Sequence, residues 1–100
     1  MYALIGRVQI KRGHEDETAV MAQEHGPALV RGMAGSEGAY WARGVDDGGE
    51  LIQHSFWLFA TEEEARAAET VFSSLRDMPE APAVFISADV CEVISQTGSR

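Results

Sequence analysis

Two side chains that suit acid–base or anion chemistry interrupt apolar stretches of this 100-residue chain. His54 stands within the apolar run from Leu51 to Ala60, and Arg7 lies in an apolar stretch near the N-terminus. A histidine has a pKa near neutrality and can serve as a general base. A guanidinium can hold a carboxylate or polarise a phenolate. We therefore predict His54 and Arg7 as candidate catalytic groups.

Both residues also have a structural interpretation, which the residue types alone favour. His54 can be a barrel or interface histidine that a backbone group or carboxylate satisfies. Arg7 can pair with Asp89 or Glu92 on the last predicted strand, which is expected to neighbour the first. The catalytic and structural alternatives stay open at this point.

Three aromatic residues are candidates for a ligand site: Tyr40, Trp41 and Trp57. Tyr40 and Trp41 are adjacent in a predicted strand, so they point to opposite faces, and one of them can line a site while the other packs. Packing or a dimer contact explains both equally well, and Trp57 on its own is more typical of a core.

Other kinds of site have weak support. His14, His25 and His54 share no metal-ligand spacing, and Cys91 is the one cysteine. The glycines near residue 35 follow a predicted helix instead of opening one, so they do not form a phosphate-binding loop. We predict no metal and no cofactor.

The amino-acid composition limits which classes of partner the protein is expected to bind. The chain has 16 acidic against 8 basic residues and a net charge of −8, which disfavours nucleic acid and anionic membranes as partners. A single cysteine suits a reducing compartment. The N-terminus lacks the pattern of a secretion signal, and no apolar stretch is long enough to span a membrane. We expect a cytoplasmic protein.

The pattern of elements predicts a ferredoxin-like α+β fold. Strands are expected over 2–10, 39–45, 51–60 and 83–94. A helix over 14–33 is interrupted at Gly26-Pro27, and a second helix begins at the capping box Thr61-Glu62-Glu63-Glu64. The buried stripe of the first helix is expected to consist of Ala19, Ala22, Gly26, Leu29, Val30 and Met33. The order βαββαβ builds a four-stranded antiparallel sheet with both helices on one face. We expect one domain over residues 1–95 and a flexible tail over 96–100.

The strand over 51–60 carries bulky apolar groups on both faces. Leu51, Trp57 and Phe59 point one way, while Ile52, Phe56 and Leu58 point the other. The last strand repeats this two-sided pattern, with Val84, Ile86, Val90 and Ile94 expected on one face and Phe85, Cys91 and Val93 on the other. The helices can cover one face, so the other needs a different cover. A second copy burying about 800 Å² per subunit is an ordinary dimer interface. We therefore predict a homodimer through the sheet face.

Three segments carry a resemblance to a known family: Tyr2-Ala3-Leu4-Ile5-Gly6-Arg7-Val8, Gly35-Ser36-Glu37-Gly38-Ala39-Tyr40-Trp41 and Leu58-Phe59-Ala60-Thr61-Glu62-Glu63-Glu64-Ala65. From Tyr2 to Ile94 the chain resembles the antibiotic-biosynthesis-monooxygenase-like group of the dimeric α+β barrel superfamily. In that superfamily the sheets of two subunits close into a barrel. Members include oxygenases of aromatic polyketides that use no metal or flavin, and haem-degrading enzymes.

The haem-degrading branch has an Asn in the first strand, and a Trp and a His in or near the second helix. Here Arg7 is expected at the strand position, Ala67 and Ala68 lie in the helix, and no histidine follows His54. The resemblance therefore disfavours haem degradation. It implies a small monooxygenase-like protein acting on an aromatic or quinone-like molecule without metal or flavin. The alternatives are a non-catalytic module that binds a small ligand or dimerises, and a regulatory domain of the amino-acid-binding kind.

Overall fold

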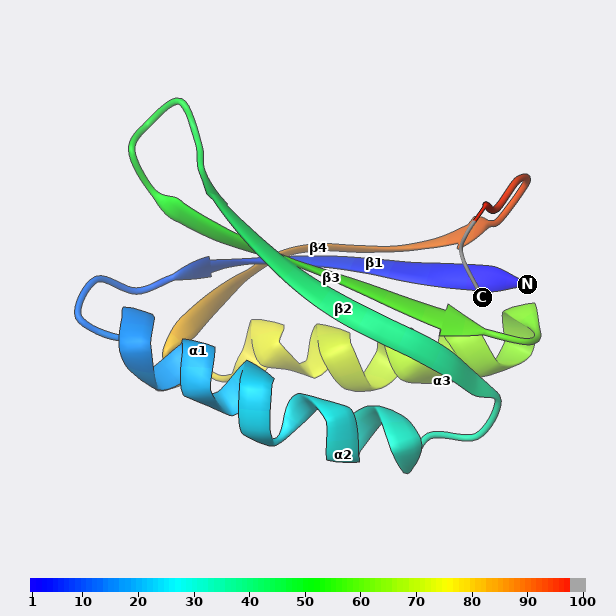
Figure 1. Ribbon diagram of the computed structural model, residues 1–100. Coiled ribbons are helices and arrows are strands. Elements are labelled where there is room, and N and C mark those ends of the chain that lie inside the picture. Colours follow the sequence, from blue (N-terminus) through cyan, green and yellow to red (C-terminus); the bar gives the residue numbers. More distant parts are fainter. Residues whose placement is uncertain (98–100) are drawn as a thin grey trace.

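The computed structural model describes residues 1–97, apart from the side chain of Val30. Its elements follow the predicted βαββαβ order, with the first helix divided in two (Figure 1). They are β1 (Tyr2–Ile10), α1 (Glu15–Glu24), α2 (Gly26–Arg31), β2 (Ser36–Val45), β3 (Leu51–Phe59), α3 (Glu62–Ser73), the 3-10 turn η1 (Ser74–Asp77) and β4 (Ala83–Glu92). The predicted tail over 96–100 lies partly outside the described residues.

The four strands form one antiparallel sheet in the order β2-β3-β1-β4. Figure 1 shows α1, α2 and α3 together on one face of this sheet, which we call the helix face. No helix or strand within residues 1–97 covers the opposite face, which we call the outer face. The predicted ferredoxin-like α+β fold is confirmed. None of the helices in this range has the length and apolar character needed to cross a membrane.

Local sequence signals account for where the helices begin and end. Thr61 caps α3: its hydroxyl accepts from the Glu64 amide at 3.2 Å and donates to the Glu64 carboxylate at 2.9 Å. α1 ends at Glu24 and α2 begins at Gly26, as the Gly26-Pro27 pair predicted. A Cβ on Gly26 would lie 2.6 Å from the Trp41 ring, so this junction needs glycine in order to approach β2.

The core lies between the helix face and α3. Leu4 of β1 is opposite Trp57 of β3, and both are buried with Phe59 against Ala65 and Ala68. On the other side of β3, Phe56 and Leu58 are half-buried on the outer face. The predicted two-sided pattern of this strand is therefore confirmed.

Two expectations about buried positions are wrong. Leu29, predicted in the buried stripe of the first helix, is 50% exposed because it lies beside an open cavity. The predicted alternation of the last strand grouped Val90 with Val84 and Ile86 on one face. A register shift between Arg7 and Val8 of β1 breaks this alternation in β4, so Val90 is opposite Leu4 and packs against the core.

Candidate functional site

A cavity of about 580 Å³ opens between the two helical segments on the helix face. α1 and α2 form one wall, α3 with η1 forms the other, and β1, β2 and β3 form the floor. The volume is that of an ordinary small-molecule site. Its lining residues are Val8, Ile10, Thr18, Met21, Ala22, His25, Gly26, Leu29, Trp41, Gln53, Ser55, Trp57, Val71, Phe72, Ser74, Leu75, Met78, Ala81, Pro82 and Ala83.

The floor of the cavity is aromatic. The rings of Trp41 and Trp57 are edge to face, with centroids 6.3 Å apart, and Trp57 meets Phe72 in the same way at 6.2 Å. Trp57 is 5% exposed, and its buried indole N–H has no hydrogen-bond partner among the described residues. An indole N–H usually finds an acceptor when it is buried. The floor therefore offers a flat apolar surface.

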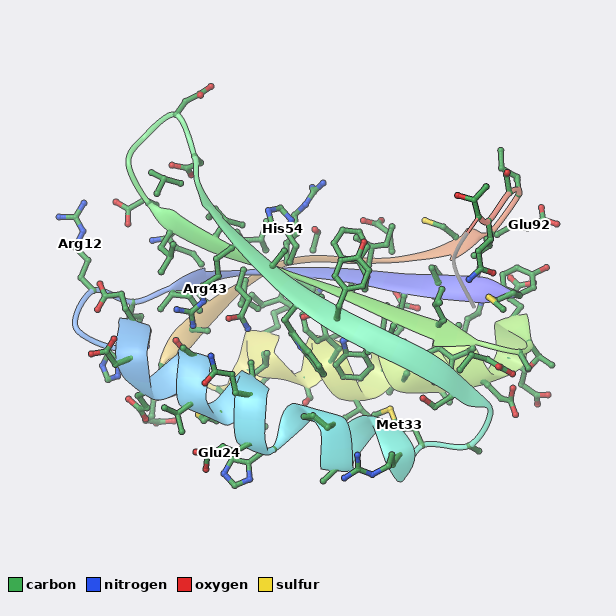
Figure 2. The ribbon with its side chains drawn as sticks, viewed as in Figure 1. Arg12, Glu24, Met33, Arg43, His54 and Glu92 are labelled. Atoms are coloured by element: carbon green, nitrogen blue, oxygen red, sulfur yellow. The ribbon has the colours of Figure 1, made fainter. Side chains whose placement is uncertain are left out.

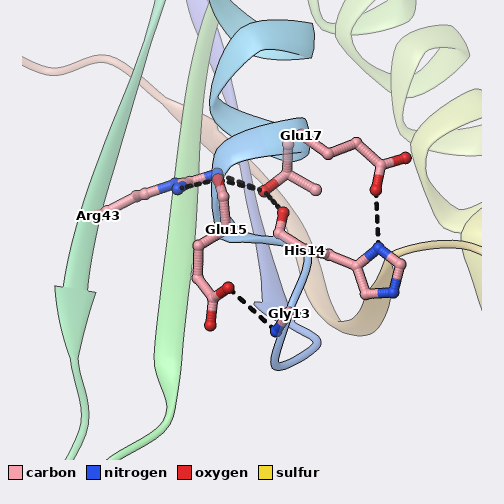
Figure 3. A network of polar contacts seen from close by, with 6 residues as sticks. Gly13, His14, Glu15, Glu17 and Arg43 are labelled. Carbon is pink, nitrogen blue, oxygen red and sulfur yellow. Dashed lines mark hydrogen bonds and ion pairs between the residues drawn. The ribbon is translucent and has the colours of Figure 1, made fainter.

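The polar part of the cavity lies along β3 and is held by Arg43 of β2. Arg43 Nε donates to Gln53 Oε1 at 2.9 Å, and its Nη1 donates to the backbone oxygen of Glu15 at 2.9 Å. Its Nη2 donates to the Thr18 hydroxyl, which in turn donates to the backbone oxygen of His14 at 2.7 Å. Figure 3 shows the contacts by which Arg43 joins β2 to the first turn of α1. Arg43 thereby fixes one end of the cavity.

Three of the predicted site residues lie on the outer face instead. Arg7 of β1 is directly opposite His54 of β3, and Figure 2 shows His54 on the side of the sheet away from the helices. Tyr40 stacks on Phe56, with ring centroids 4.8 Å apart and an interplanar angle of 17°. The structure thus brings Trp41 and Trp57 together in the cavity but places Arg7, His54 and Tyr40 outside it.

The alternative role for Arg7 is not observed within the chain. Arg7 is opposite Ser87 in β4, and none of the ion pairs within residues 1–97 joins it to Asp89 or Glu92. Asp89 is opposite Ile5, and Glu92 is opposite Tyr2 on the helix-face side of β1. Asp89 and Glu92 therefore lie further along β4 than the residue opposite Arg7.

Sequence reasoning missed Gln53, Ser55, Phe72 and Arg43. A signal for two of them was available, because Gln53 and Ser55 have the same strand parity as Trp57. The same parity separates His54 from Trp57. Phe72 and Arg43 come from other elements, and their proximity depends on tertiary packing that no spacing reveals.

The residues do not fit the haem-degrading pattern. β1 contains no Asn, and its central helix-face position is Gly6, which Phe72 covers. α3 contains neither Trp nor His. Across the described chain, no group of three or more His, Cys, Asp or Glu residues is placed to hold a metal ion.

Comparisons with known proteins agree with the fold. A scan against protein-family models and a search of curated proteins found no match. Among solved structures, the chain is similar to a mutant of MhuD crystallised with two manganese protoporphyrin IX molecules bound per active site. The TM-score is 0.64 at 18% identity, and the match covers 99% of this chain and 100% of that chain. The predicted family resemblance is confirmed at the level of the fold, which is the ferredoxin-like α+β fold that MhuD shares.

Proposed function

We propose that the protein is a small monooxygenase-like protein that binds an aromatic or quinone-like molecule in the cavity on the helix face and acts on it without metal or flavin. The observation that carries the proposal is the aromatic floor formed by Trp41, Trp57 and Phe72 within a cavity of about 580 Å³. Edge-to-face and stacked rings recognise flat aromatic ligands. The similarity in fold to MhuD is consistent with this use of the cavity.

The mouth of the cavity supports an apolar ligand. Four of its lining residues are large apolar side chains that are about half exposed: Met21, Leu29, Val71 and Met78. Exposed apolar side chains that gather at one place mark a binding surface more often than chance. Methionines adapt their shape to a bound ring, so two of them at the mouth suit a ligand that enters and leaves.

The proposed reaction needs little from the protein beyond binding and proton transfer. An electron-rich phenol or enol supplies two electrons and two protons to O₂. One oxygen atom bonds to the substrate carbon and the other leaves as water. Among the described lining residues, His25 carries the ionisable side chain that can accept a proton from a bound hydroxyl group.

Intrinsic fluorescence tests the proposal directly, because the chain has two tryptophans and both line the cavity. Titration with the neutral quinone menadione should quench the emission with saturation. Addition of dithranol, a hydroxylated anthrone, should consume O₂ faster than the uncatalysed oxidation. An unquenched emission at all menadione concentrations would refute ligand binding in the cavity.

A non-catalytic ligand-binding module is the second candidate. It is favoured by the scarcity of ionisable groups, since His54 and Arg7 lie on the outer face and His25 is the one ionisable side chain among the described lining residues. Saturable quenching by menadione without O₂ consumption above the uncatalysed rate would support this candidate over the enzyme.

We also propose that the outer face forms a homodimer interface that closes the two sheets into a barrel. Tyr40 and Val84 are 60% and 47% exposed there, beside the half-buried Phe56 and Leu58. At about 25 cal/mol per Å² of apolar surface, burying even half of an 800 Å² patch is a sizeable driving force. In such a dimer, Arg7 and His54 face the partner subunit.

A further inference from the structure

We infer that the cavity selects an aromatic ligand whose ring carries an ionised hydroxyl or a carbonyl oxygen, and that this oxygen lies against Gln53 and Ser55 of β3. This inference rests on the proposed function and adds the chemical class of the ligand. The two residues alternate along one strand, so their side chains point to the same face about 7 Å apart. Both line the cavity.

The first step is the orientation of the Gln53 amide. Arginine has donors and no acceptor, so the group that faces Arg43 Nε at 2.9 Å must be the Gln53 carbonyl oxygen. The amide nitrogen is therefore the end that remains for a ligand. It takes part in none of the hydrogen bonds between residues 1–97, and its two hydrogens can only donate.

The second step is that the neighbouring side chain on β3 can also donate. The Ser55 hydroxyl can donate or accept, and this residue is 4% exposed. A ligand oxygen satisfies the Gln53 amide and the Ser55 hydroxyl as donors, whereas a ligand amine or a bare hydrocarbon leaves the amide unsatisfied.

The third step is charge. Arg43 is bonded to neutral acceptors, namely Gln53 Oε1, the Thr18 hydroxyl and the backbone oxygen of Glu15. None of the ion pairs within residues 1–97 involves Arg43, so no carboxylate neutralises it by direct contact. Its positive charge strengthens the Gln53 amide as a donor and favours an anion at this end of the cavity. Arg43 is thus a positioning residue that acts through Gln53.

Three ligands of similar ring size test the inference: lawsone, a hydroxynaphthoquinone that is an anion at neutral pH; menadione, a neutral quinone; and naphthalene, which has no oxygen. Binding is measured by tryptophan quenching and checked by calorimetry. We expect the wild-type protein to bind lawsone most tightly and naphthalene most weakly, with about tenfold between lawsone and naphthalene.

The decisive variant is Gln53→Glu. A glutamate keeps the oxygen that accepts from Arg43, so the network and the fold are retained, but it removes the amide donor and neutralises the cation. We expect lawsone affinity to fall about tenfold and naphthalene affinity to stay unchanged. Gln96→Glu makes the same charge change at an exposed residue and should alter neither the lawsone affinity nor the naphthalene affinity. Arg43→Met should lower the ratio of lawsone to naphthalene affinity, whereas a purely structural role would weaken both ligands equally.

The outcomes separate the inference from the proposed function. If all three ligands bind with equal affinity and Gln53→Glu changes none of them, the aromatic cavity stands and the selection of an oxygen anion is refuted. If none of the three ligands binds, the proposed function fails and the inference fails with it.

Discussion

Gly6→Ala is the substitution whose effect can be worked out most fully from the structure. Gly6 lies on the helix face of β1, where a Cβ would be 2.5, 2.6 and 2.9 Å from three atoms of the Phe72 ring. Carbon atoms in contact are normally about 3.5–4.0 Å apart, so the ring must move by roughly 1 Å. Phe72 packs between Trp57 and Phe85, with centroids 6.2 and 5.9 Å away, and it borders the cavity. The displaced ring therefore moves toward the cavity.

Overpacking of this kind lowers the free energy of unfolding by about 1–3 kcal/mol. With a urea dependence of about 1–3 kcal/mol per molar for a small protein, the unfolding midpoint should fall by roughly 1 M. The displaced ring should also weaken menadione binding, because it takes up ligand space. Urea unfolding at a fixed protein concentration and fluorescence titration measure the two effects.

Gly44→Ala is the matched control, since Gly44 is also a strand glycine but a Cβ there meets nothing within 4 Å. It should be neutral or slightly stabilising. The double variant Gly6→Ala with Phe72→Leu should recover part of the lost stability relative to the sum of the single changes. Equal urea midpoints for Gly6→Ala and Gly44→Ala would refute the close packing of Phe72 on β1.

Three further predictions concern the helix cap, the outer face and the predicted catalytic histidine. Thr61→Ala removes the cap of α3 and should lower the free energy of unfolding, measured by urea unfolding, by about 1 kcal/mol. Thr70 is an exposed residue further along α3, and Thr70→Ala is the control. A loss of stability in Thr61→Ala that is no larger than the loss in Thr70→Ala would argue against the cap. Wild-type protein should elute as a dimer in size exclusion with light scattering and Phe56→Glu as a monomer, because the new charge is placed in the apolar outer face; a monomeric wild type at micromolar concentration would rule out the dimer. His54→Ala should leave menadione affinity unchanged because His54 lies on the other face of the sheet, and a tenfold loss in the quenching titration would contradict the placement of the site.

The fold was predictable because its signals are local. The Thr61 capping box, the Gly26-Pro27 interruption and the two-sided apolar strand each depend on residues close together in the sequence. Their order then leaves few topologies for a chain of this length. The prediction failed where a non-local feature intervened. An extra residue in β4 opposite Arg7 and Val8 changes the face of every later side chain, and alternation along a sequence cannot reveal it.

The candidate site was predictable only in part. Trp41 and Trp57 were chosen as aromatic residues in strands, and strand parity could have separated Trp57 from His54, which lies on the same strand. Trp41 and Trp57 lie near Phe72, Arg43 and the mouth of the cavity because the two helical segments leave a gap over the sheet. That gap depends on how α1, α2 and α3 pack on the sheet, which the sequence specifies through many weak contacts and no single motif.

A crystal structure of the protein with menadione would test the central claim most directly. We predict electron density for one planar ring system in the cavity on the helix face, in contact with Trp41, Trp57 and Phe72. Density on the outer face beside Arg7 and His54, with an empty cavity, would contradict the account.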